Sequence, residues 1–308
     1  SVLRDEQLWR SGTERGSRTA TTSLTLRIYP ALKNGIVWAL IWFGIQSAYA
    51  HGGPPFTRDV LLGPNRVSLV TTHGFFSDQD AWAWVCDEAT GADIAASIIR
   101  NGTHWAVGTL AGVRLSQDGC HWYDDPNLAG RFIIRVFSDV IEPDRIWAVT
   151  HEGLWRIDGG QNAILEHTAP MSLRDAIQGP NGDFMMVGFE GSTPVFLSGG
   201  APMVLPTTAG RMQFMTVDDN DRVYIRFPAG DTDQLLRISG REIEVLLPLT
   251  SLIYGVFVSE NRIYVLQRAG ITSTVDDGKS WSLTRGLPLQ CLRASPEGFY
   301  GCPFSRGE

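Results

Sequence analysis

The chain has 308 residues, with 33 Gly, 16 Pro, 10 Trp and only 19% charged residues, a composition that suits short strands joined by tight turns and excludes a disordered chain. The formal net charge is −7, and because the first 50 residues hold six basic and three acidic residues, the rest carries about −10. Such an acidic surface repels phosphate backbones, so we expect no nucleic-acid partner.

Residues 27–50 have the pattern of an export signal. Arg27 and Lys33 form the basic flank, residues 35–45 (GIVWALIWFGI) form the apolar core, and residues 48–50 (AYA) match the small-x-small pattern that signal peptidase cleaves. We expect removal of residues 1–50, which leaves residues 51–308 as a single domain in the bacterial periplasm or outside the cell. The alternative is an uncleaved anchor, but the apolar run is shorter than the roughly 20 residues of a bilayer span. We therefore expect no membrane span in the mature chain.

A repeated phrase predicts the fold. A polar turn, a β-rich run, a Gly and a second run occur in residues 65–75 (NRVSLVTTHGF) and again in residues 144–154 (DRIWAVTHEGL), and weaker copies follow. One position of the phrase recurs every 36 to 42 residues, at Ser68, Trp105, Trp147, Met185, Tyr224, Tyr264 and Tyr300. Four-stranded sheets of this size cannot bury their faces alone, and stacking them around an axis solves the problem. We predict an all-β, seven-bladed β-propeller of four-stranded antiparallel blades.

The strands of two blades can be placed from the alternation of residues. In the second blade we expect strands over residues 93–99, 104–109, 112–116 and 121–124. In the last blade only two strands, over residues 290–294 and 299–303, precede the end of the sequence at Glu308. Either the mature N-terminal segment completes this blade or the C-terminus is truncated and leaves an open edge. Residues 51–57 are rich in proline for central strands, which favours truncation.

Two turns carry a motif that is known as the Asp box, [ST]-x-D-x-G-x-x-W. Residues 274–281 (TVDDGKSW) match it at every fixed position, namely Thr274, Asp276, Gly278 and Trp281, and Ser116, Asp118 and Trp122 form a copy that is one residue shorter. Residues 77–82 (SDQDAW) are a degraded version without Gly. The Asp side chain can bond to backbone N–H groups of its own turn, Gly allows positive φ, and Trp packs between sheets. We therefore interpret these residues as structural.

Over residues 58–303 the chain resembles the BNR/Asp-box repeat proteins, a superfamily that includes sialidases, sortilin-like receptors and the photosystem II stability/assembly factor. Residues 84–89 (WVCDEA), the DGCHW box and the cysteines of the final blade are most similar to exported, uncharacterised BNR-like proteins of myxobacterial type. This resemblance implies a fold far more than a reaction.

The four cysteines of an exported chain are expected to pair. Cys291 and Cys302 lie on consecutive expected strands, within reach of a cross-strand disulfide. Cys86 ends a strand of the first blade, whereas Cys120 lies in a turn toward the opposite face, so the pairing of these two stays open.

A ligand surface is expected on the face that is formed by the turns between second and third strands and by the links between blades, because these converge around the channel. Its polar candidates are His73, Asp87, Glu88, Asp93, His151, Glu152, Glu190 and Arg268. The equivalent positions of His73 and His151 in their blades are explained by repeat ancestry. We expect a monomer that binds a protein or glycan as a scaffold or receptor and catalyses no reaction.

The alternative function is a sialidase-like glycoside hydrolase, which needs three arginines around a carboxylate, an acid/base Asp and a Tyr–Glu pair. The phrase RIYP at 27–30 imitates its first arginine motif but precedes the signal core. Other arginines are available, several of them in turns before second strands, where solvation explains them: Arg131, Arg135, Arg145, Arg156, Arg222 and Arg226. No cofactor is predicted, because the six histidines lack metal-site spacing. A free His51 amino terminus could chelate copper, but no second ligand is evident.

Overall fold

The computed structural model describes residues 57–63, 66–71, 74–77, 83–86, 94–101, 104–119, 121–159, 162–206, 212–229, 232–247, 251–259, 262–285, 289–295 and 298–303. All of them belong to one compact unit, Pro54–Glu308. The predicted export signal at residues 27–50 lies outside the described residues. Among the described residues, no helix is long and apolar enough to cross a membrane.

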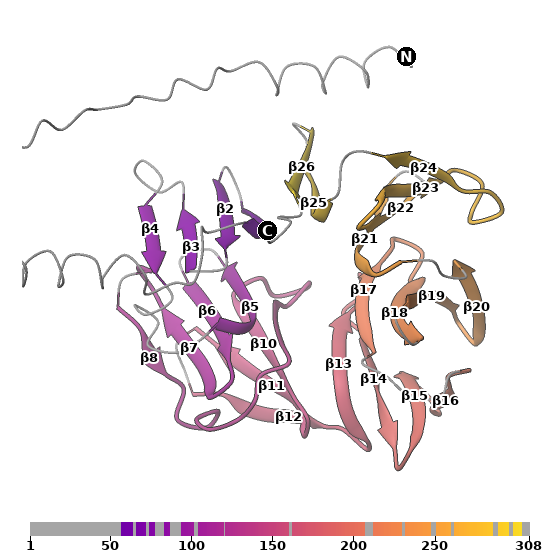
Figure 1. Ribbon diagram of the computed structural model, residues 1–308. Helices are drawn as coiled ribbons and strands as arrows, with labels where there is room; N and C mark the ends of the chain where they lie inside the picture. Colours follow the sequence, from indigo (N-terminus) through magenta and orange to yellow (C-terminus); the bar gives the residue numbers. More distant parts are fainter. Residues whose placement is uncertain are drawn as a thin grey trace, which may run out of the picture. The chain divides into compact units, whose positions relative to one another are not determined.

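The described residues form six four-stranded antiparallel sheets and one two-stranded sheet (Figure 1). The strands of sheets 1 to 3 are β1 (Thr57–Gly63), β2 (Arg66–Thr71), β3 (Gly74–Ser77), β4 (Ala83–Cys86); β5 (Ile94–Asn101), β6 (His104–Thr109), β7 (Gly112–Ser116), β8 (Tyr123–Asp124); and β9 (Arg135–Ser138), β10 (Arg145–Thr150), β11 (Gly153–Asp158), β12 (Ile164–Thr168). Those of sheets 4 to 6 are β13 (Ser172–Gln178), β14 (Phe184–Glu190), β15 (Thr193–Ser198), β16 (Met203–Val204); β17 (Gln213–Val217), β18 (Val223–Ala229), β19 (Thr232–Ser239), β20 (Glu242–Leu247); and β21 (Ile253–Ser259), β22 (Arg262–Gln267), β23 (Gly270–Thr274), β24 (Ser282–Arg285). Sheet 7 consists of β25 (Leu289–Ser295) and β26 (Gly298–Pro303).

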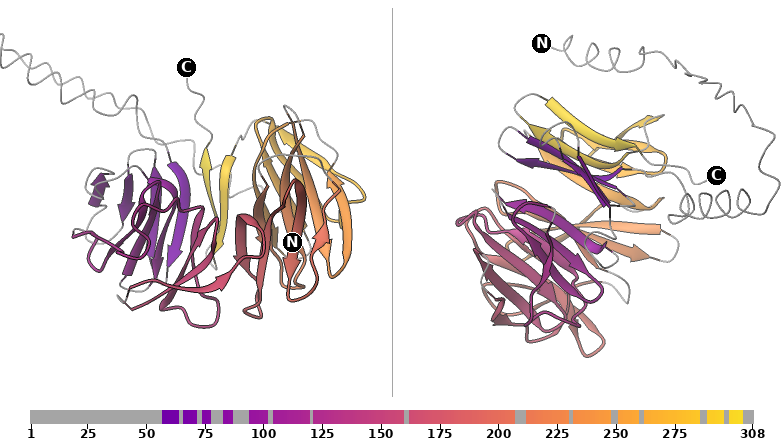
Figure 2. Two further views of the ribbon diagram at one scale, coloured as in Figure 1. Left: turned by 90° about the horizontal axis from the view of Figure 1, so that it is seen from below. Right: turned by 90° about the vertical axis from the view of Figure 1, so that its left-hand side faces the viewer.

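The sheets are arranged as the blades of a propeller (Figures 1 and 2). The first strand of each sheet contacts the first strand of the next, and β25 contacts both β21 and β1. Separate hydrophobic clusters fill the spaces between neighbouring sheets, so each sheet buries its faces against its neighbours. The prediction of an all-β propeller of four-stranded antiparallel blades is thus confirmed for six blades.

The repeated position lies on the second strand of each sheet, and it is buried at Ser68, Trp105, Trp147, Met185 and Tyr224. Trp147 Nε1 donates a hydrogen bond of 2.7 Å to Asp139, and the Tyr224 hydroxyl donates one of 3.0 Å to Asp218. Both aspartates also accept backbone N–H groups of the turn that follows the first strand of their sheet. Burial, aided by the charge of Asp218, raises the pKa of Tyr224 to about 12. The repeated aromatic therefore connects the sheet core to a capped turn.

The glycine of the repeated phrase opens the third strand of its blade with positive φ. At Gly270 φ is +139°, and a Cβ atom there would lie 2.1 Å from the carbonyl oxygen of Thr284 in the adjacent strand β24. Glycine permits this close approach of two backbones, which a side chain would prevent.

Gly270→Ala is therefore expected to lower the free energy of unfolding by about 2 kcal/mol, because either the backbone conformation or the β23–β24 pairing must be strained. Urea unfolding followed by circular dichroism measures the change. Gly240→Ala is the matched control, since Gly240 also has positive φ but no atom near its Cβ position. An equal loss in both variants would contradict the steric argument.

The predicted disulfide between Cys291 and Cys302 is confirmed. The two residues are direct partners in the β25–β26 pairing, and both are buried against Val60 and Leu69 of sheet 1. The bridge therefore lies where the two-stranded sheet packs on the first blade. The question of a Cys86–Cys120 pair lies outside the described side chains.

Candidate binding face

The antiparallel order of each blade divides the loops between two ends of the molecule. Turns between second and third strands share one end with the links from one blade to the next, and we name this the link end. Turns between first and second strands, and between third and fourth, lie at the opposite end, which we name the box end because both Asp boxes are there.

Four of the predicted binding residues are described, and all are exposed at the link end. His151 and Glu152 form the β10–β11 turn, Glu190 ends β14, and Arg268 lies in the β22–β23 turn. The structure thus brings together His151 and Glu152 but leaves the other two on separate blades. The remaining candidates lie outside the residues that the structure describes: His73, Asp87, Glu88 and Asp93.

The link before β9 contacts the β10–β11 turn through Phe132 and Arg131. Phe132 was not predicted as part of the binding site, and Arg131 was considered only for a sialidase-like site. The Phe132 ring stacks on His151 with centroids 5.8 Å apart and planes inclined by 13°. Arg131 forms an ion pair of 2.5 Å with Glu152, and its guanidinium lies over the Trp155 ring. His151 in turn donates from Nδ1 to the carbonyl oxygen of Leu173 in the next blade, at 2.8 Å. The predicted pair is therefore part of a surface that crosses blades.

A buried carboxylate joins three first strands near the link end. Asp175 of β13 accepts two hydrogen bonds of 2.8 Å from Arg135 of β9 and one of 2.9 Å from the backbone N–H of Phe214 in β17. Asp233 of β19 makes similar contacts, since it accepts the N–H of Ile253 and pairs with Arg226. Sequence reasoning missed both aspartates, because nothing in the local pattern separates them from surface residues.

The six arginines that were considered for a sialidase-like site are all paired with acidic side chains. Two of them, Arg145 and Arg222, were expected to be solvated in turns before second strands, and this expectation was wrong: each is half-buried in an ion pair. A guanidinium that is neutralised by a protein carboxylate is a poor clamp for a substrate carboxylate. The pairs are Arg131–Glu152, Arg135–Asp175, Arg145–Asp158, Arg156–Glu166, Arg222–Asp218 and Arg226–Asp233.

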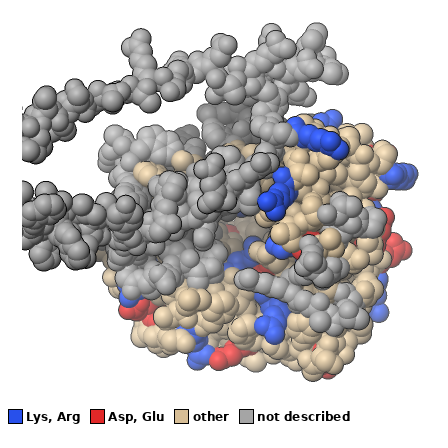
Figure 3. All heavy atoms as spheres, in the orientation of Figure 1, with Lys and Arg blue, Asp and Glu red and all other residues tan. Residues whose placement is uncertain are grey.

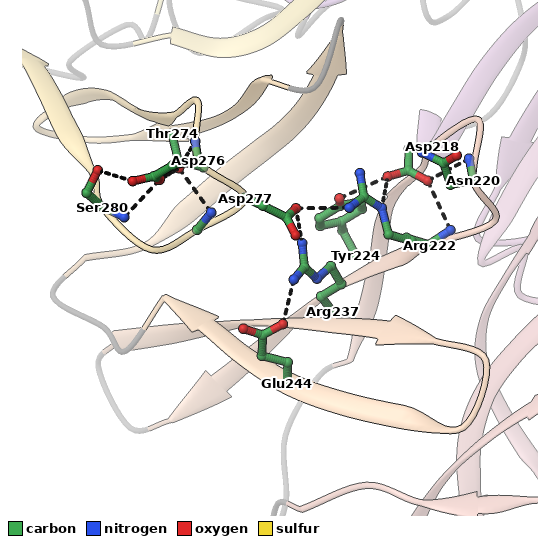
Figure 4. Close-up of polar contacts among 11 residues, drawn as sticks. Asp218, Asn220, Arg222, Tyr224, Arg237, Glu244, Thr274, Asp276, Asp277 and Ser280 are labelled. Atoms are coloured by element: carbon green, nitrogen blue, oxygen red, sulfur yellow. Dashed lines mark hydrogen bonds and ion pairs between the residues drawn. The ribbon is translucent and has the colours of Figure 1, made fainter.

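The Asp box of sheet 6 is a closed set of hydrogen bonds within its own turn (Figure 4). Thr274 donates to Asp276 at 2.7 Å, and Asp276 accepts both the backbone N–H and the hydroxyl of Ser280. Gly278 has φ of +92° and donates its N–H to the Thr274 hydroxyl. Trp281 packs against the hydrophobic cluster between sheets 5 and 6. The polar side chains of this turn are therefore occupied by hydrogen bonds within the turn itself.

The shorter box in sheet 2 makes the same kinds of bonds. Ser116 donates to Asp118, Gly119 donates its N–H to Ser116, and Asp118 accepts the backbone N–H of His121. Trp122 packs edge-on against Phe75 of sheet 1. Both boxes therefore place their Trp in the space toward the preceding blade.

Asp277 extends the box of sheet 6 to the preceding blade. Its carboxylate pairs with Arg222 of sheet 5 at 2.9 Å and with Arg237, which also pairs with Glu244 at 2.6 Å (Figure 4). Burial opposes ionisation of Asp277, but the two arginines outweigh it and hold the pKa of this carboxyl below its usual range. The box end of these blades is thus a network of internal ion pairs.

Hydrogen bonds from Ser280 and Thr274 lower the pKa of Asp276 to about 2. A carboxyl whose folded pKa is depressed stabilises the fold above its unfolded pKa of about 3.9 and loses that contribution as the pH falls through its folded pKa. We expect wild type to be more stable than Asp276→Asn at pH 5 and this difference to vanish between about pH 4 and about pH 2. Urea midpoints at a series of pH values measure it. A difference that is independent of pH would contradict the assignment.

Positive side chains gather around the hollowed middle of the face shown in Figure 3, although the chain as a whole is acidic.

Among the described residues, no group of three or more His, Cys, Asp or Glu side chains is arranged to hold a metal ion.

No protein-family model matches the chain, and no curated protein matches it in sequence. Solved structures are similar in fold. YCF48 from Cyanidioschyzon merolae has a TM-score of 0.58 at 15% identity, over 82% of this chain and 94% of that chain. A structure of YCF48 bound to D1 peptide has a TM-score of 0.55 at 15% identity, over 81% and 90%. The extracellular domain of BT4673 from B. thetaiotaomicron has a TM-score of 0.61 at 11% identity, over 83% and 38%. At these identities the likeness shows the β-propeller fold alone.

Proposed function

We propose that this chain is a non-enzymatic binding or scaffold protein that recognises a segment of a partner protein at its link end. The observation that carries the proposal is the surface around Phe132 and His151, where aromatic and charged side chains are exposed on turns that hydrogen bonds fix in place. Exposed aromatic and arginine side chains on rigid supports are typical of protein-binding sites. YCF48, which is similar in fold, has been solved with a bound peptide.

The same chemistry supports binding without catalysis. The six arginines considered for a sialidase-like site have acidic partners in the described part of the chain, and the polar atoms of the Asp boxes bond within their own turns. The link end offers contact surface, with no described nucleophile paired to a base.

We also propose that the protein acts in the periplasm or outside the cell and that β25 and β26 are an incomplete seventh blade. The Cys291–Cys302 disulfide is typical of an oxidising compartment. The contacts of β25 with both β21 and β1 support the assignment of β25 and β26 as a blade. Membership of the BNR/Asp-box superfamily is part of this proposal and rests on the two boxes.

The test is binding of the purified full chain to an array of random hexapeptides, with turnover of a fluorogenic sialoside measured in parallel. We expect selection of a subset of peptides and no turnover. Failure of every peptide to bind a chain that unfolds cooperatively would overturn the peptide-binding proposal. Turnover that a single arginine substitution abolishes would overturn the non-enzymatic one.

A further inference from the structure

An apolar ridge occupies the link end of blades 2 and 3. Phe132 is 40% exposed and Leu110 is 56% exposed, whereas Ile133, the neighbour of Phe132, is fully buried. The core is therefore filled by Ile133, and folding does not require an aromatic residue at position 132. Large apolar side chains that remain exposed next to one another are typical of interaction sites.

The backbone holds the two side chains of this ridge together. Leu110 lies in the β6–β7 turn, and the carbonyl oxygens on either side of it accept N–H groups from the link before β9, Gly130 to Ala111 at 2.6 Å and Ile133 to Thr109 at 3.2 Å. The link is also bonded to blade 3, since Ile134 donates to Val149 at 2.8 Å. Leu110 and Phe132 are thus displayed on a rigid support, which lowers the entropic cost of binding.

The ridge continues through His151 to a positive charge that has no acidic partner among the described residues. His151 stacks on Phe132, accepts the Leu173 N–H at its carbonyl oxygen and bonds through its ring to the Leu173 carbonyl oxygen. Arg174 follows Leu173, is exposed, and lies over the Phe189 ring at 5.4 Å. The carboxylate of Glu190 in the same blade forms no ion pair with it. Arg174 therefore differs from Arg131 and Arg135, whose charges are neutralised by Glu152 and Asp175.

We infer that Leu110, Phe132, His151 and Arg174 form one docking strip for an extended peptide segment that carries an apolar side chain and, a few residues away, a carboxylate. This inference rests on the proposed function and names the chemistry of the partner. The apolar side chain packs on Leu110 and Phe132, and the carboxylate pairs with the uncompensated charge of Arg174. The strip crosses blades 2 to 4, about 20 Å if packed sheets lie roughly 10 Å apart, which is the length of about six residues of extended chain.

The experiment compares the full chain with two variants on a hexapeptide array in which each position is varied in turn. We expect wild type to select an aromatic or aliphatic residue together with Asp, Glu or a free carboxyl terminus. Phe132→Ala should weaken binding of the best peptide about thirtyfold, the loss typical of a buried aromatic anchor. Arg174→Gln should abolish the preference for an acidic group while the apolar preference remains.

Matched controls are Val204→Ala on β16 and Arg241→Gln in the β19–β20 turn, both exposed away from the strip. Selected peptides that bind Phe132→Ala and Arg174→Gln as tightly as wild type would overturn the strip and leave peptide binding intact. No peptide binding by folded wild type would overturn both proposals. Binding of glycans, lost in Phe132→Ala, would overturn the peptide assignment and identify the strip as a sugar-binding surface.

Discussion

Asp175→Asn is expected to lower the free energy of unfolding by about 3 kcal/mol, because it breaks a buried ion pair on one side only. Asp175 is 2% exposed and accepts hydrogen bonds from Arg135 on β9 and from the Phe214 N–H on β17. An amide has nearly the shape of the carboxylate, but it lacks the charge and turns a donor toward Arg135 or Phe214. The guanidinium of Arg135 loses the carboxylate of Asp175 but keeps its hydrogen bond to the carbonyl oxygen of Phe214.

Chemical unfolding at pH 7, followed by tryptophan fluorescence, measures this loss. Asp158→Asn is the matched control, because Asp158 pairs with Arg145 but is considerably more exposed, and exposed pairs contribute about 0–1 kcal/mol. Arg135→Met added to Asp175→Asn should recover part of the loss, since it removes a partly buried charge that no longer faces the Asp175 carboxylate. Equal losses in Asp175→Asn and Asp158→Asn would show that burial of the carboxylate does not determine its contribution.

The sequence predicted the strands well where polar turns bound alternating runs. The expected strands over residues 104–109 and 112–116 match β6 and β7, and those of the last blade differ from β25 and β26 by one residue at their starts or ends. Such runs are local, because a strand is fixed by its own alternation and by the turn residues at its ends. The disulfide could be predicted from the expected pairing of these two strands, because a four-residue connection brings the two cysteines opposite one another.

The candidate site could be predicted only in part. The end of the molecule that carries His151 and Glu152 followed from strand order, but their contacts depend on how neighbouring sheets pack. Phe132 meets His151 from the link before β9, and Asp175 meets Arg135 from 40 residues away. A local sequence pattern cannot predict contacts between residues that lie so far apart in the sequence. A sequence signal was available only at the box end: an aspartate directly after a first strand, followed by an aromatic in the second strand, as in Asp139 with Trp147.

The box end shows how a local motif can have a non-local effect. Residues 274–281 identify the turn, yet Asp277 occupies a variable position of the motif and pairs with two arginines of the preceding blade. The turn gives Asp277 a φ of +62°, which Asp adopts more readily than most residues, and its carboxylate reaches out of the turn to the preceding blade.

Replacing both Cys291 and Cys302 by Ser is expected to lower the free energy of unfolding by about 3 kcal/mol, which is the loop-closure contribution of a bridge between residues 11 apart. The double variant leaves no unpaired thiol at this site. Unfolding of wild type and variant by guanidinium chloride, without reductant, measures the loss.

The loss should also have a definite location in the molecule. A two-stranded sheet is marginally stable by itself, and β25–β26 depends on the bridge and on its packing against Val60 and Leu69. In hydrogen exchange, the amides of β25 and β26 should lose protection first in the variant, followed by those of β1, while sheets 3 to 5 keep theirs. Uniform loss of protection in every sheet would instead mean that the propeller unfolds as one cooperative unit. The two-stranded sheet would then not be its least stable part.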